Sequence, residues 1–145
     1  MKVVGRASEF MVIGENIHTT RIVLRKGKRV TSDPEGRESV RYLDAGNNPR
    51  YLTIPESVRS TQDYEEGRVK HVKIAIQGAM SGKEPAATEG MAYLDRLIER
   101  QVEAKADYLD LNVDEISLKL DEQKVAMKWL VKTIKIRTTT PLSVD

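Results

Sequence analysis

Three short apolar runs along the chain predict β-strands. Residues 10–13 form a continuous hydrophobic run that stops at Gly14. Such a run is typical of a strand that is covered on both faces, as in parallel sheets. Residues 108–113 and 140–145 contain similar runs, and the two-residue period of a strand places Asp110 and Asn112 on one face of the second run. We therefore expect three strands of a parallel sheet.

Two longer stretches carry apolar residues at helical spacing. One includes Met91, Leu94, Ile98 and Val102, and it predicts a helix that opens after Pro85 and ends near residue 105, with Thr88 as the candidate N-cap. The other predicts a helix capped by Asp121, and its expected core residues are Ala126, Trp129, Leu130 and Ile134. Strand, helix and strand over residues 108–145 predict a right-handed βαβ unit.

Residues 21–85 show a different pattern. Short β-prone pieces at 22–24, 40–43 and 51–54 are separated by Gly, Asn and Pro residues that favour turns. A helix should follow them, with the apolar stripe Val69, Val72, Ile76 and Met80. We interpret 21–85 as a β-rich and helical insertion between the first two strands of the sheet. His71 lies between lysines, so we expect it to be exposed.

Polar side chains gather where the three predicted strands end. Because the carboxyl ends of parallel strands meet at one rim of a barrel, these side chains should lie close together. Their alternative role is structural, as hydrogen-bond partners of the backbone amides of the rim. The residues are Glu15, Asn16 and His18 after the first strand, Asp110, Asn112 and Asp114 around the second, and Asp145 at the third.

The amino-acid composition excludes several classes of functional site. The chain has 145 residues, a formal net charge of +2 and no Cys, which excludes disulfides, thiol nucleophiles and Cys-ligated metals. Two distant His residues are too few for a zinc site, so we predict no metal. No membrane-spanning run or signal peptide is present in the sequence, and we expect a cytoplasmic location. Residues 21–29 are basic but lack interleaved aromatics, which favours a solvated hairpin over nucleic-acid binding.

Four motifs then resemble a known family. They look like the opening strands and helices of pterin-binding TIM barrels, above all the methyltetrahydrofolate:corrinoid methyltransferases and the folate module of cobalamin-dependent methionine synthase. The resemblance covers residues 10–20 and 86–145, and the motifs are VIGENIH at 12–18, ADYLDLNVDE at 106–115, AMKWLV at 126–131 and PLSVD at 141–145.

The resemblance implies a fold, an activity and a site. The fold would be α/β, the N-terminal part of a TIM barrel with about three βα units, within a single partial barrel domain over residues 1–145. Asp145 matches the family aspartate that hydrogen-bonds the pterin, and Asp110 and Asn112 would line the same pocket. Glu15, Asn16, His18 and Asp114 would be rim contacts, although the family has Arg and Asn where this chain has Asn16 and His18.

The implied reaction moves a methyl group from methyltetrahydrofolate to a corrinoid (cobalamin) on a partner protein or domain. The resemblance identifies no catalytic side chain, since the protein holds the pterin and the corrinoid supplies the reactivity. With the rest of the barrel missing, the 145 residues alone should bind pterin poorly and should either self-associate or need a complementary half, so we expect a homo-oligomer and an inactive isolated chain. Alternatives are dihydropteroate synthase, whose Gly-Gly and Ser-Thr-Arg-Pro-Gly runs do not follow Asn112, and a non-catalytic barrel module that binds a partner protein.

Overall fold

The computed structural model describes residues 2–5 and 10–144, and these form a mixed α/β fold. The strands are β1 (Lys2–Gly5), β2 (Phe10–His18), β3 (Val23–Leu24), β4 (Val30–Ser32), β5 (Glu38–Leu43), β6 (Pro49–Thr53), β7 (Arg68–Val69), β8 (Tyr108–Asn112) and β9 (Leu142–Val144). The helices are α1 (Glu56–Arg59), α2 (Gln62–Glu65), α3 (His71–Ser81), α4 (Ala86–Glu103) and α5 (Leu120–Arg137).

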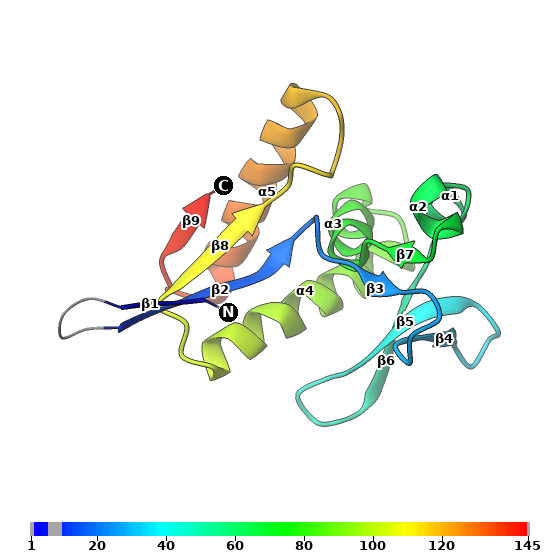
Figure 1. The fold of residues 1–145 in the computed structure, drawn as a ribbon, viewed down its shortest axis with the longest axis horizontal. Helices are drawn as coiled ribbons and strands as arrows, with labels where there is room; N and C mark the ends of the chain where they lie inside the picture. The colour runs from blue at the N-terminus through cyan, green and yellow to red at the C-terminus, as the bar shows by residue number, and fades with distance from the viewer. Residues whose placement is uncertain (1, 6–9, 145) are drawn as a thin grey trace.

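The largest sheet has the strand order β1-β2-β8-β9 (Figure 1). β2 pairs in parallel with β8, although residues 19–107 separate them in sequence, and β8 pairs in parallel with β9. The predicted order of three parallel strands is therefore confirmed. Within the described residues the sheet is open, with no closed barrel.

The edge of β2 away from β8 is partly occupied by β1. The two strands pair antiparallel, from Lys2 opposite Ile13 to Gly5 opposite Phe10. The sequence pattern did not predict this hairpin. It covers the amino-terminal half of β2 and leaves residues 14–18 of that edge beyond the β1 pairing.

β2 is longer than predicted, and its register changes partway along. Gly14 is opposite Leu109, whereas Ile17 is opposite Leu111, so β2 uses three steps where β8 uses two. This is the extra residue of a β-bulge. The prediction that Glu15, Asn16 and His18 follow the first strand in a loop is wrong, because the parallel pairing continues through the bulge to His18.

α4 and α5 lie beside the sheet in Figure 1, and both were predicted close to their observed bounds. Their N-caps differ from the prediction. Pro85 is the N-cap of α4, with Thr88 inside the helix, and Lys119 precedes α5, with Asp121 in its first turn. A carboxylate there favours the helix through the macrodipole rather than by capping. Among the described helices, none is long and apolar enough to span a membrane.

Residues 21–85 form two small antiparallel sheets and a helical segment. β4, β5 and β6 make a three-stranded meander, and β3 pairs with β7. The β-prone pieces thus form strands, but Val69 belongs to β7 rather than to the helix. α3 carries the predicted apolar stripe and ends at Gly82, whose left-handed backbone (φ 66°) is a common helix stop.

Two glycines allow α3 and α4 to approach closely. A Cβ on Gly90 of α4 would overlap the carbonyl oxygen of Ala75 and lie 2.8 Å from the Ala79 nitrogen, both on α3. A Cβ on Gly78 of α3 would lie 2.8 Å from the Ala86 carbonyl oxygen. The contact is backbone against backbone, so the inserted segment is held tightly to the helix that covers the sheet.

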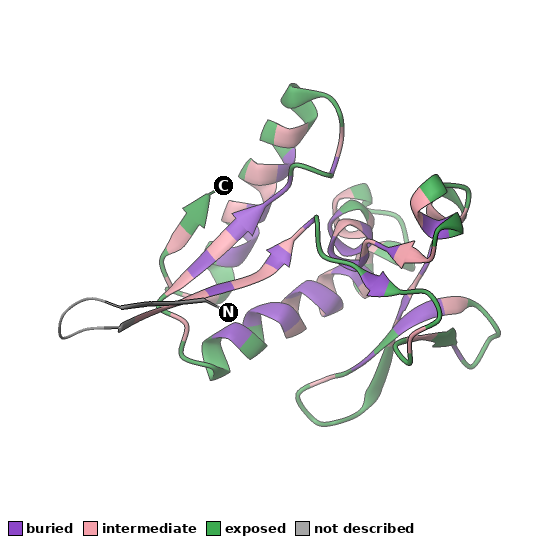
Figure 2. Cartoon of the chain, viewed as in Figure 1, coloured by how far each residue is buried: buried purple, intermediate pink, exposed green. Residues whose placement is uncertain are grey.

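The core runs from the helix face of the sheet into the α3–α4 contact (Figure 2). Leu109 and Leu111 of β8 are buried in it, and Trp129 is partly buried against it, as predicted. The prediction for His71 is wrong, since its side chain is only 6% exposed. His71 opens α3 and faces α4 rather than solvent, because Tyr93 of α4 bonds its ring.

Candidate functional site

The candidate site lies at the carboxyl ends of β2 and β8, on the face of β8 that carries Asp110 and Asn112. We call this the site face. Leu109 and Leu111 point to the opposite, helix-covered face, as the alternation of a strand requires. The site face therefore brings two polar residues of one strand to the end where parallel sheets place their ligand sites.

His18 joins this face from β2. It is opposite Asn112 in the strand register, and its Nε2 lies 3.0 Å from Oδ2 of Asp110, with both side chains about 15% exposed. Among the described residues, Oδ1 of Asp110 makes no hydrogen bond. The β-bulge explains the pairing, because the extra residue shifts His18 by one position and so onto the face of Asp110.

Asn112 is buried, with 6% of the residue exposed, and it bonds the turn that follows β8. Its Oδ1 accepts hydrogen bonds from the backbone N–H of Asp114 at 2.9 Å and from Oγ1 of Thr19 at 3.4 Å. Its Nδ2 donates to Oδ2 of Asp114 at 3.1 Å. These contacts fix the amide in one orientation and tie β8 to the segment after β2.

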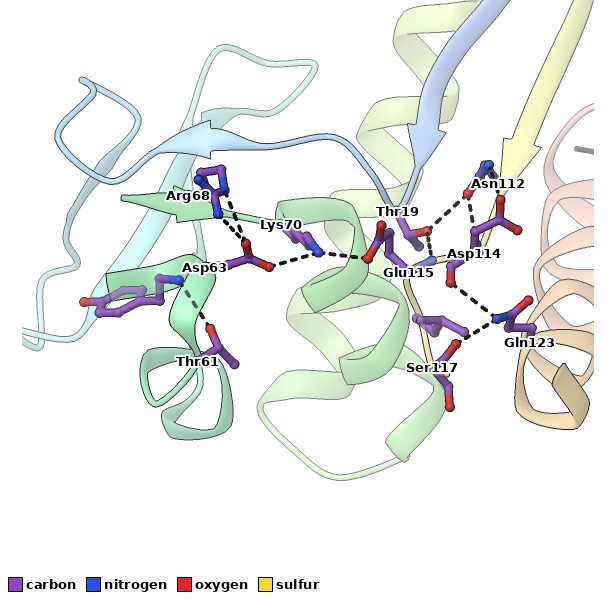
Figure 3. A network of polar contacts seen from close by, with 12 residues as sticks. Thr19, Thr61, Asp63, Arg68, Lys70, Asn112, Asp114, Glu115, Ser117 and Gln123 are labelled. Atoms are coloured by element: carbon purple, nitrogen blue, oxygen red, sulfur yellow. Dashed lines mark hydrogen bonds and ion pairs between the residues drawn. The ribbon is translucent and has the colours of Figure 1, made fainter. Parts of the chain in front are cut away.

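The polar contacts continue outward from Asn112 (Figure 3). Thr19 is fully buried, and its Oγ1 accepts a hydrogen bond from the Glu115 backbone N–H at 3.1 Å. On the other side, Gln123 of α5 donates to the carbonyl oxygens of Asp114 and Ser117. The turn after β8 is thus held by the end of β2 and by the start of α5.

Lys70 connects this turn to the inserted segment. Its Nζ lies 2.9 Å from Oε2 of Glu115 and 3.0 Å from Oδ2 of Asp63, and Arg68 holds the same Asp63 (Figure 3). The hydrogen bond to Glu115 raises the pKa of Lys70, while Arg68 and Lys70 lower the pKa of Asp63. Residues 21–85 therefore contact the carboxyl-end side of the sheet through ion pairs.

Not all of the predicted site residues reach the site face. Asn16 donates from Nδ2 to the Leu97 carbonyl oxygen on α4, which directs its side chain to the helix-covered side. The backbone oxygen of Glu15 accepts a hydrogen bond from Nε of Arg21. Asp145 lies outside the described residues. The structure thus brings together His18, Asp110, Asn112 and Asp114, and it places Asn16 elsewhere.

A second buried polar group was not predicted from the sequence. Oη of Tyr93 lies 2.6 Å from Nδ1 of His71 and accepts a hydrogen bond from Nη2 of Arg29 at 2.8 Å. Burial, with the Arg29 and Arg21 guanidinium groups nearby, lowers the pKa of His71 to about 3. The ring is therefore neutral, and the chain of contacts from Arg29 through Tyr93 to His71 joins the inserted segment to α3 and α4.

Comparison with known proteins adds no family or relative to this description. Scans against family models, curated proteins and solved structures gave no match. Among the described residues, no three His, Cys, Asp or Glu side chains are placed to hold a metal ion together. The function therefore has to be argued from the site face and from the motifs that surround it.

Proposed function

We propose that this chain is the N-terminal part of a pterin-binding TIM barrel that transfers a methyl group from methyltetrahydrofolate to a corrinoid on a partner protein or domain. The observation that carries the proposal is the meeting of the Asp-x-Asn pair of β8 with His18 at the carboxyl ends of parallel strands. Parallel α/β proteins place their ligands at these ends.

The chemistry of the site face suits the edge of a pterin ring. That edge presents amide-like donors and acceptors, which a carboxylate and a carboxamide can pair with in a site that excludes water. Asp110 keeps Oδ1 for such a donor while its Oδ2 faces His18. The Asn112 side chain is held in one orientation, so little entropy is lost when a ligand meets it.

In this proposal, methyl transfer requires few further groups from the protein. The donor nitrogen must gain hydrogen-bonded or positive character as the methyl leaves, and the corrinoid supplies the nucleophile. His18 and Asp110 are placed to orient the donor and to hold a proton near it. Nε2 of His18 makes no hydrogen bond among the described residues, although Oδ2 of Asp110 lies 3.0 Å away, so it can bond a ligand.

The sheet can be completed to a barrel from both of its sides. β9 presents its outer edge, and on the other side β1 pairs only with residues 10–13 of β2. In the proposed barrel the last strand would therefore pair with residues 14–18 of β2, next to the bulge. That arrangement leaves the hairpin at the amino-terminal end, away from the site face.

A non-catalytic barrel module is the second candidate. It is favoured by Asn112, whose oxygen already bonds the backbone of the turn after β8, as a purely structural residue would. The two candidates differ in one measurable property, because a non-catalytic module has no reason to bind a pterin.

Calorimetric titration of the complete gene product with methyltetrahydrofolate tests the proposal. We expect binding, and we expect Asp145→Ala or Asp110→Ala to weaken it by about 1.5 to 3 kcal/mol, the usual loss for a hydrogen bond to a charged group. Asn112→Ala should weaken it as well. Glu65→Gln, which changes an exposed carboxylate on α2, is the matched control. Absence of binding in the unmodified protein would favour the non-catalytic module.

A further inference from the structure

Five cations lie close together on one segment of the insertion. Arg21, Arg25, Lys26, Lys28 and Arg29 fall within nine residues and are all exposed. Among the described residues, none of them forms an ion pair, whereas Arg37, Arg50, Arg59, Arg68, Arg96 and Arg137 each lie within 4 Å of a carboxylate. Six of the twelve arginines are thus paired with a carboxylate, and among the described residues the segment 21–29 gathers five cations without such a partner.

The arginines of the segment are held by uncharged groups. Nε of Arg21 donates to the Glu15 carbonyl oxygen, and Nη2 of Arg29 donates to Oη of Tyr93. The Arg25 guanidinium lies 4.0 Å from the centre of the Tyr64 ring. These contacts position the side chains without cancelling their charge, so the positive field remains available to a binding partner.

Apolar side chains are exposed among these cations. Ile22 is 40% exposed and Leu24 is 63% exposed. Val23, between them, is buried within the inserted segment, where it pairs with Val69 of β7. Exposed aliphatic side chains surrounded by positive charge are typical of a protein interface with an apolar centre and a charged rim. Residues 21–29 contain no aromatic side chain, so they have no ring that could stack on nucleic-acid bases.

The segment begins at the site face. The Arg21 backbone N–H donates to the carbonyl oxygen of His18 at 3.0 Å, so the basic residues follow directly from the end of β2. Residues 21–29 therefore start beside the site face, within reach of a macromolecule that binds there.

We propose that residues 21–29 are the docking surface for the protein that carries the methyl acceptor, and that this partner presents an acidic surface with an apolar centre. The proposal rests on the proposed function, because it names the surface through which that site receives its acceptor. Charge complementarity selects and orients the partner, and Ile22 and Leu24 supply the apolar contact.

Methyl transfer to two acceptors tests the docking surface separately from the site. The complete gene product would be assayed with free reduced cobalamin and with the purified corrinoid protein of the same organism, at saturating methyltetrahydrofolate. The variant is Lys26→Glu with Lys28→Glu, since neither exposed side chain forms a hydrogen bond or ion pair within the part of the chain that the structure describes. The control is Lys128→Glu with Lys132→Glu, which makes the same charge change on exposed positions of α5.

We expect the Lys26 and Lys28 variant to lower kcat/KM for the corrinoid protein by about 10-fold or more and to leave free cobalamin unchanged, as loss of steering by charge does. Raising NaCl from about 50 to 500 mM should slow the unmodified protein and the control more than the variant. An equal loss with both acceptors, an unchanged rate with the corrinoid protein, or a change confined to the KM of methyltetrahydrofolate would overturn the docking surface. Absence of transfer to either acceptor would overturn the proposed function with it.

Discussion

Acidification should destabilise this protein well above the pH at which its carboxylates are protonated, because His71 is buried without charge. Burial and two nearby guanidinium groups lower the pKa of His71 from 6.5 to about 3. In the unfolded chain the imidazole takes a proton below about pH 6.5. The folded protein does not take that proton until about pH 3, so the unfolded state gains stability as the pH falls between these values.

The magnitude follows from the width of this window. Each pH unit between the two pKa values favours the unfolded state by about 1.4 kcal/mol. Between pH 6.5 and pH 4.5 the free energy of unfolding should therefore fall by about 2 to 3 kcal/mol, which is a large part of the 5 to 15 kcal/mol of a typical domain. Below that range Asp33, Asp44 and Asp63 also contribute, since their pKa values are lowered and their protonation removes native contacts.

Urea unfolding at pH 7.0, 6.0, 5.0 and 4.5, followed by circular dichroism, would measure the effect. His71→Asn is the matched variant, because the uncharged amide of asparagine sits near the position of Nδ1 and can still form a hydrogen bond with Oη of Tyr93. The variant should lose less than about 1 kcal/mol over the range in which the unmodified protein loses about 2 to 3 kcal/mol. Parallel pH dependences of the two proteins would refute the assignment of the effect to His71.

Three further changes should show how the inserted segment is attached. Tyr93→Phe should lower the free energy of unfolding by about 1 to 3 kcal/mol in urea titration, because buried Nδ1 of His71 loses its hydrogen-bond partner. Gly90→Ala should cost about 2 to 3 kcal/mol, since its Cβ meets backbone atoms of α3 that cannot move independently, and an unchanged melting temperature would contradict this packing. Lys70→Met should cost about 1 kcal/mol by losing two ion pairs, and its double-mutant cycle with Glu115→Gln should show coupling.

Hydrophobic patterns over neighbouring residues predicted the strands β8 and β9 and the helices α4 and α5. The runs at 108–113 and 142–144 and the helical stripes that became α4 and α5 each carry enough periodicity to identify the element. The parallel order of β2, β8 and β9 followed from continuous hydrophobicity and from the helix between two of the strands. The strand β1 was not predicted, because no local pattern in the sequence indicates its antiparallel pairing with β2.

The contacts of the inserted segment were also beyond local patterns. His71 stands among lysines in the sequence, yet it is buried because Tyr93 and Arg29, 22 and 42 positions away, converge on it. Lys70 meets Glu115 across 45 positions. Periodicity describes which face of a helix is apolar, but it does not say which distant polar group will satisfy a buried nitrogen.

The bulge in β2 decides which candidate residues belong to the site face. In a regular strand Gly14, Asn16 and His18 would share one face, and Gly14 faces Gln101 of α4. Asn16 follows that rule and bonds α4, but the extra residue before Ile17 moves His18 to the other face, where it meets Asp110. One inserted residue thus assigns two neighbouring polar side chains to opposite roles, one holding a helix and one available to a ligand. Bulges are common beside functional sites because they re-aim a side chain in this way, and the position of His18 is the feature of this chain that most directly links its backbone to the proposed chemistry.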